Sequence, residues 1–217
     1  MKSSGTRILL VRHGETEWNR LRRFQGRSDL PLNPVGRQQS HALAMALEDE
    51  SLAAIYSSPM MRAIETARII ADRHPTAPFI EEQGFIEMDL GDFEGMHAQH
   101  WMTHYPDFRK AWQDRPATVR LPGGECLADV QRRAVDSLER ITRRAVPGST
   151  LLICSHNFVI ISILCYASGI SLDRFWNMRQ DPTGLNILYR QGKQYQVERV
   201  NDRSHLRKHD REQTVRD

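Results

Sequence analysis

The chain has 217 residues, of which 40% are hydrophobic and 26% charged, a composition typical of one globular domain with a sizeable core. A net charge of +3 is too small to indicate a nucleic-acid-binding protein. No apolar run approaches the roughly 20 residues that span a bilayer, and no signal-peptide core precedes Arg12. The three cysteines lack the spacing of a metal motif. We therefore expect a cytoplasmic protein that binds neither nucleic acid nor membrane.

Strands and helices are predicted to alternate along the first half of the chain. Residues 7–11 form a buried strand, and Asn33 with Pro34 then begins a helix that extends to about residue 48. A second strand covers 53–57, a helix runs from 59 to about 73, and a short strand covers 79–82. The segment 84–95 is rich in glycine and acidic residues and is expected to be a loop.

The second half continues the alternation and ends in a predicted hairpin. A helical stretch over 98–112 is interrupted by Pro106, and apolar residues at helical spacing predict a helix over 125–145. A buried strand at 150–154, an apolar helix at 158–167 and a hairpin of 185–190 with 194–200 follow. The pattern predicts a three-layer, doubly wound α/β fold whose mostly parallel sheet has helices on both faces and an antiparallel edge. We expect one domain over 1–206, a small helical cap inserted at about 95–122, and a charged, flexible tail at 207–217.

Charged and histidine side chains follow three of the predicted strands. Arg12 and His13 come after the first strand, and His156 follows the strand at 150–154. Because ligands of open α/β sheets bind beyond the carboxyl ends of strands, these side chains are expected to face a pocket. Arg62 lies in the first turn of the helix after the second strand, where a bound anion would satisfy both the helix dipole and the guanidinium. Each residue alone could be structural, but together they favour an anion site.

The segment Leu10-Val11-Arg12-His13-Gly14-Glu15-Thr16 resembles the signature of the histidine phosphatase superfamily, also called the phosphoglycerate mutase-like family. The likeness extends over residues 7–206 through Trp18-Asn19, Gln25-Gly26, Leu32-Asn33, Gly36, Tyr56-Ser57-Ser58-Pro59, Arg62, Thr66-Ala67, Glu87, Gly91-Asp92-Phe93-Glu94-Gly95, Pro122-Gly123-Gly124-Glu125, Ser155-His156, Asn201-Asp202 and His205-Leu206.

This resemblance implies that His13 attacks phosphorus and becomes phosphohistidine, while Arg12, Arg62 and His156 surround the phosphoryl oxygens. Glu87 corresponds to the general acid, although its loop also holds the alternatives Glu81, Glu82, Asp89, Asp92 and Glu94. The expected substrate-binding residues are Asn19, Gln25, Gly26, Asn157 and His205. The family often has glycine after the second catalytic histidine, whereas Asn157 and Phe158 follow here, and this departure is expected to alter the pocket.

The segment 95–122 is short and only moderately basic, so it resembles the phosphatases rather than the cofactor-dependent mutases of the family. We therefore expect a metal-independent, acid-type histidine phosphatase, a phosphomonoester hydrolase that acts without a cofactor on a small phosphorylated metabolite. A phosphoglycerate mutase and, more remotely, an inactive relative that binds a phosphorylated ligand are the alternatives. The cap aromatics Trp101, Phe108 and Trp112 either pack against one another or recognise the leaving group. The resemblance also suggests a homodimer.

Overall fold

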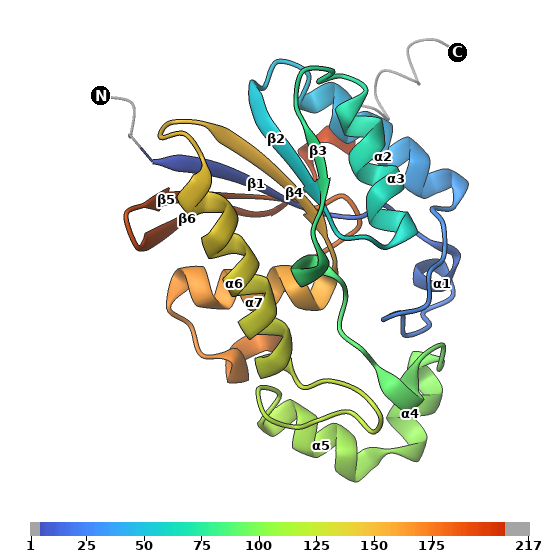
Figure 1. The fold of residues 1–217 in the computed structure, drawn as a ribbon. Helices are drawn as coiled ribbons and strands as arrows, with labels where there is room; N and C mark the ends of the chain where they lie inside the picture. Colours follow the sequence, from blue (N-terminus) through green and yellow to red (C-terminus); the bar gives the residue numbers. More distant parts are fainter. Residues whose placement is uncertain (1–4, 207–217) are drawn as a thin grey trace.

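A computed structural model describes residues 5–206, so the expected tail at 207–217 lies outside the described residues. Its centre is a six-stranded sheet with the order β3-β2-β4-β1-β5-β6 (Figure 1). The strands are β1 Thr6–Arg12, β2 Leu52–Ser57, β3 Phe79–Glu81, β4 Thr150–Ser155, β5 Leu185–Gln191 and β6 Gln194–Asp202. Strands β3, β2, β4 and β1 are parallel to one another, whereas β5 pairs antiparallel with both β1 and the edge strand β6. The predicted mixed sheet is confirmed.

Two helix pairs cover opposite faces of this sheet (Figure 1). Successive side chains of a strand point to opposite faces. Accordingly, Leu9 and Val11 of β1 pack with α2 (Pro34–Ala46) and α3 (Met61–Ala71). Ile8 and Leu10 pack with α6 (Leu127–Arg144) and α7 (Asn157–Ser168) in the larger core. A strand that is buried on both faces explains the uninterrupted apolar run at 8–11.

Local sequence signals explain where the longer helices begin and end. The Asn33 side chain accepts a hydrogen bond from the Gly36 amide at 2.7 Å, and Pro34 occupies the first turn of α2. Helix α7 ends at Gly169, which has a φ of 65°, a conformation that favours glycine. Four shorter elements were not predicted: α1 Glu17–Arg20, η1 Gln83–Phe85, η2 Gly91–Phe93 and η3 Leu172–Asn177. Each spans one or two turns, too few residues for a hydrophobic period to appear.

The segment expected to form a cap contains two short helices, α4 (Ala98–His104) and α5 (Pro106–Asp114), drawn in green in Figure 1. Tyr105 separates them, because the proline that follows disfavours helical backbone at this position. Trp101 and Trp112 are buried and meet edge to face, with ring centroids 5.8 Å apart. Trp112 also packs against Phe158 of α7, so the cap joins the larger core. Over residues 5–206, no helix is long and apolar enough to cross a membrane.

Candidate active site

The carboxyl ends of three parallel strands meet at one edge of the sheet. The His13 amide, just past β1, donates to the Ser155 carbonyl of β4 at 3.0 Å. The Ser58 amide, just past β2, donates to the Cys154 carbonyl at 2.9 Å. These bonds extend the sheet by one residue and bring the His13 and His156 rings to within 5.1 Å, centroid to centroid. The sequence-predicted grouping of the two histidines is therefore present.

The His13 ring is held with one nitrogen fixed and the other available. Its Nδ1 lies 2.7 Å from the Gly14 carbonyl, so Nδ1 carries the proton and Nε2 keeps its lone pair. Nε2 has no hydrogen-bond partner among the described residues. Burial, and then the charges of Arg62 and Arg12, lower the pKa of His13 well below its ordinary value of 6.5. The imidazole is thus neutral at neutral pH, as a nucleophile requires.

Two glycines let the turn after His13 rest directly on the start of α2. A Cβ atom on Gly14 would lie 2.4 Å from the Gly36 carbonyl oxygen, and one on Gly36 would lie 2.1 Å from the Glu15 carbonyl oxygen. Thr66 of α3 accepts from the Gly14 amide at 3.0 Å. The backbone that holds His13 is consequently fixed by both helices on this face.

Arg62 is fully buried beside the histidines. Its Nη atoms donate to the Gly26 carbonyl at 2.8 Å and to the Ser28 carbonyl at 2.9 Å. Burial lowers the pKa of Arg62 to about 10, against the opposing effect of nearby carboxylates, so the guanidinium stays charged at neutral pH. Since the side chain begins in the first turn of α3, it adds positive charge to a helix N-terminus.

The loop that contacts Arg62 is itself anchored by Glu94. The Glu94 carboxylate accepts hydrogen bonds from the amides of Gly26, Arg27 and Ser28, at distances of 2.9–3.1 Å. This contact aims the Gly26 and Ser28 carbonyls at the guanidinium. In the sequence, Glu94 appeared within the family-like motif Gly91-Asp92-Phe93-Glu94-Gly95 and as an alternative to Glu87. Its anchoring role could not be predicted because its partners lie far away along the chain.

His156 has both ring nitrogens occupied within the protein. Its Nδ1 accepts from the Arg62 Nε at 3.2 Å, which leaves Nε2 to carry the proton and donate to the Ser58 hydroxyl at 2.7 Å. The ring is fully buried, and burial together with Arg62, His13 and Arg12 lowers its pKa well below 6.5. His156 is therefore a neutral donor behind His13.

Arg12 and Gln25 each keep a buried donor without an acceptor. The Arg12 Nη1 donates to the Gln180 carbonyl at 2.6 Å, but its Nε has no partner within residues 5–206. The Gln25 Oε1 accepts from the Thr16 hydroxyl at 2.7 Å, and its Nε2 likewise has no partner there. An unpaired buried donor costs about 1–3 kcal/mol, and an acceptor beside either group would offset that cost.

Glu87 is the only carboxylate among the described residues that line the cavity next to His13. It accepts hydrogen bonds from the Met88 amide at 2.8 Å and from the Phe158 amide, in the first turn of α7, at 3.3 Å. Burial raises the pKa of Glu87 above its ordinary value, although these amides and both arginines oppose the shift. Glu87 can thus hold a proton at a higher pH than an exposed glutamate.

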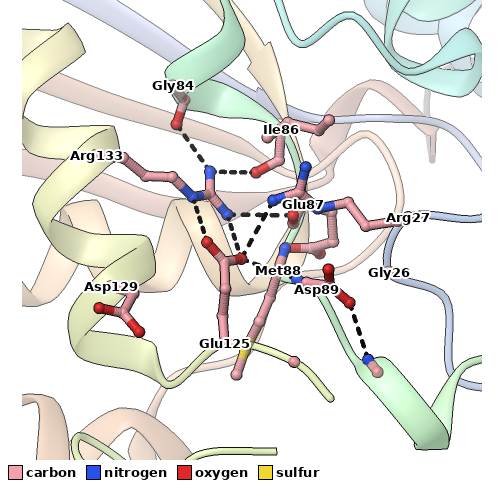
Figure 2. Close-up of polar contacts among 12 residues, drawn as sticks. Gly26, Arg27, Gly84, Ile86, Glu87, Met88, Asp89, Glu125, Asp129 and Arg133 are labelled. Carbon is pink, nitrogen blue, oxygen red and sulfur yellow. Dashed lines mark hydrogen bonds and ion pairs between the residues drawn. The ribbon is translucent and has the colours of Figure 1, made fainter.

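Arg133 of α6 holds the backbone that precedes and includes Glu87 (Figure 2). It donates to the carbonyls of Gly84 at 3.0 Å, of Ile86, and of Glu87 at 3.1 Å. Two further bonds, each 3.0 Å long, join it to the Glu125 carboxylate in a bidentate pair. Glu125 also accepts from the Asp89 amide at 2.9 Å, so the pair fixes the loop on both sides of Glu87.

A cavity of about 350 Å³ opens in front of His13. It brings together six predicted site residues: Arg12, His13, Asn19, Gln25, Glu87 and Asn157. Arg62, His156 and Gly26 do not line this cavity. The His156 ring lies beside the His13 ring, and Gly26, whose carbonyl accepts from Arg62, follows Gln25 in the chain. His205 is also outside: it is buried, and its Nε2 is 3.1 Å from the Thr183 hydroxyl.

The remaining lining is mostly apolar and comes from separate elements: Arg23, Phe24, Leu90, Ala98, Trp101, Met102, Trp112, Phe158 and Trp176. Trp101, Trp112 and Phe158 were singled out in the sequence, but the others were not, because no periodic pattern marks side chains gathered from loops and short helices. In the described part of the chain, no group of three or more His, Cys, Asp or Glu side chains could hold a metal ion.

Comparison with known proteins identifies the family of the chain. The sequence profile of branch 1 of the histidine phosphatase superfamily matches residues 8–203. Phosphoserine phosphatase 1 of Hydrogenobacter thermophilus is 33% identical over 92% of this chain and 94% of its own. A metal-independent phosphoserine phosphatase of Arabidopsis thaliana is 30% identical over 95% and 85%, respectively. The solved structure of Bacillus stearothermophilus YhfR superposes with a TM-score of 0.86 at 34% identity, over 93% of this chain and 99% of YhfR. The chain belongs to branch 1 of the histidine phosphatase superfamily.

Proposed function

We infer that the protein hydrolyses a small phosphomonoester through a phosphohistidine on His13. The observation that carries this proposal is the His13 ring itself. It is neutral, its Nδ1 is held by the Gly14 carbonyl, and His13 lines a cavity that Arg12 and Glu87 also line. The names of the related phosphoserine phosphatases support the reaction class.

In the first step, the Nε2 lone pair attacks phosphorus, a P–N bond forms and the P–O bond to the leaving group breaks. Charge on the phosphoryl oxygens would be stabilised by Arg12, whose Nε lacks an acceptor, and by Gln25 through its Nε2. Arg62 adds positive charge close to His13. These guanidinium groups supply the charge stabilisation for a reaction without a metal ion.

The leaving oxygen takes its proton from Glu87, whose raised pKa favours the acid form. Glu87 then accepts a proton from water as that water attacks phosphorus. The P–N bond breaks, inorganic phosphate is released, and His13 and Glu87 return to their starting protonation states. Asn19 and Asn157, which line the same cavity, are placed in this proposal as further substrate contacts.

Trapping of the intermediate tests the assignment. Brief incubation with an aryl phosphate followed by alkaline denaturation should yield an acid-labile phosphorylated chain, with the phosphoryl group on His13 by peptide mass spectrometry. His13→Ala should abolish the label and lower kcat at least about 10³-fold. The control His74→Ala replaces another buried histidine, which does not line the cavity, and should keep the label and the wild-type kcat. Label on another residue, or an active His13→Ala, would overturn the proposal.

A further inference from the structure

The walls of the cavity point to a class of leaving group. The apolar side chains of the lining come from the loop after α1, the loop after Glu87, helices α4 and α5, and η3. They include Phe24, Leu90, Trp101, Met102, Trp112 and Trp176. Trp112 is central to it, with ring centroids 5.8 Å from Trp101 and 5.2 Å from Trp176. Edge-to-face contacts of this kind make a rigid wall.

This apolar surface begins directly at the candidate acid. The Phe158 amide donates to the Glu87 carboxylate at 3.3 Å, and the Phe158 ring stacks on Trp112 with centroids 5.9 Å apart. Because Glu87 must lie beside the leaving oxygen to protonate it, the rest of the leaving group extends along these rings.

An adjoining depression offers a more polar alternative, lined by Glu15, Arg22 and Arg23 among others. Neither Glu87 nor His13 lines it. A leaving group seated there would place its oxygen away from the acid, so the aromatic cavity is the better match to the proposed reaction.

Charge in the cavity argues against an ammonium-bearing leaving group. Among the described lining residues, Glu87 is the only carboxylate, whereas Arg12 and Arg23 are both cationic. An ammonium group would find no carboxylate besides Glu87 and would share the cavity with the cationic Arg12 and Arg23, so its desolvation would be poorly compensated. At the mouth, Trp176 and Met102 keep 46% and 44% of their surface exposed, which is apolar area that an apolar ligand would cover.

We propose that the protein selects phosphomonoesters with an uncharged, apolar leaving group, preferably a flat ring, and disfavours amino-alcohol phosphates such as phosphoserine. This inference rests on the proposed phosphatase function. The preferred substrate differs from the one named in the phosphoserine phosphatase relatives, because the preference is inferred from the apolar lining of this chain's own cavity.

The test compares 2-phenylethyl phosphate with phosphoethanolamine, which share a phosphorylated two-carbon chain and differ in phenyl against ammonium. We expect kcat/KM to be at least about tenfold higher for the phenyl ester, as burial of a ring in an apolar pocket predicts. The ammonium makes the amino-alcohol the better leaving group, so intrinsic reactivity opposes this order. Equal or better use of phosphoethanolamine or phosphoserine would overturn the inference and leave the phosphatase function intact. Failure to hydrolyse any monoester would overturn the phosphatase function itself.

Two variants locate the preference. Trp176→Ala should reduce the advantage of the phenyl ester at least about threefold, because it removes exposed apolar surface at the mouth. Val146→Ala, an exposed apolar residue outside the cavity, is the matched control and should leave the ratio unchanged. Thermal unfolding of both variants checks that they are folded. A folded Trp176→Ala with the wild-type ratio would refute recognition by the aromatic mouth.

Discussion

Replacement of Arg133 by methionine should destabilise the protein and misplace Glu87. The change removes donors from the carbonyls of Gly84, Ile86 and Glu87 and leaves the Glu125 carboxylate without its bidentate partner (Figure 2). Burial opposes ionisation of Glu125, but hydrogen bonds from Arg133 and the Asp89 amide outweigh it and hold its pKa below the ordinary value. The variant must therefore keep a partly buried carboxylate with less compensation.

The magnitude follows from the exposure of the pair. Breaking a fully buried ion pair costs about 3–5 kcal/mol, and each hydrogen bond to a charged group contributes about 1.5–3 kcal/mol. The side chains of Arg133 and Glu125 are 21% and 19% exposed, so solvent screens part of this cost, and Arg27 still contacts Glu125 at 3.3 Å. We expect a loss of about 2–4 kcal/mol in the free energy of unfolding.

Urea unfolding followed by circular dichroism measures this loss, and the adjacent Arg132→Met provides the control. The Arg132 side chain is 69% exposed and pairs with Asp129 on the same helix, so its removal should cost no more than about 0.5 kcal/mol. Arg133→Lys keeps the charge but not the planar fork and should fall between the two. If Arg133→Met costs as little as Arg132→Met, the argument that Arg133 holds the Glu87 loop is wrong.

Three other substitutions or titrations test separate parts of the site. Glu87→Gln should lower kcat for alkyl phosphates by about 10²–10⁴-fold. With 2,4-dinitrophenyl phosphate, whose leaving group needs no proton, the variant should release a burst of one phenol per enzyme. It should then turn over slowly, because the attacking water still needs a base. A single phase with full loss on both substrates would contradict the acid role. Nitrogen NMR should give His13 a pKa below 6.5, so that its lone pair persists as pH falls through that value. A pKa at or above 6.5 would refute the burial argument. Gly36→Ala should lower the free energy of unfolding by about 1–3 kcal/mol through overlap with the Glu15 carbonyl, even though alanine is favoured in helices. In the same urea unfolding assay, Ala in place of the exposed helical Gln38 should be near neutral. Equal stability of the two variants would show that the turn can shift.

Much of the sheet and the centre of the site could be predicted because they depend on short-range signals. The apolar run before Arg12-His13 and the one before Ser155-His156 each identify a buried strand, and parallel strands bring their carboxyl ends to one edge. Asn33 and Pro34 likewise mark a helix start from adjacent residues. The confirmed elements are thus those whose cause lies within a few residues.

The missing parts depend on partners that are distant in the sequence. Nothing near Arg133 indicates that it will reach the carbonyls around Glu87, nor does the sequence around Glu94 show that it will accept three amides from another loop. The orientation and tautomer of the His13 ring could not be predicted either, because the proton on Nδ1 follows from the position of the Gly14 carbonyl. His205 could be matched by motif, but its burial against Thr183 is a tertiary contact.

The position of β1 in the sheet also constrains how the protein can be made. This strand is synthesised before the other five strands of the sheet, yet its neighbours on both sides, β4 and β5, begin at Thr150 and Leu185. Strand pairings so remote in sequence slow folding, and the apolar β1 stays unpaired until β4 and β5 have been synthesised. Since the backbone of His13 is held by Ser155, a nascent chain that ends before β4 has no assembled site. Assembly of the His13 site therefore has to follow the synthesis of β4.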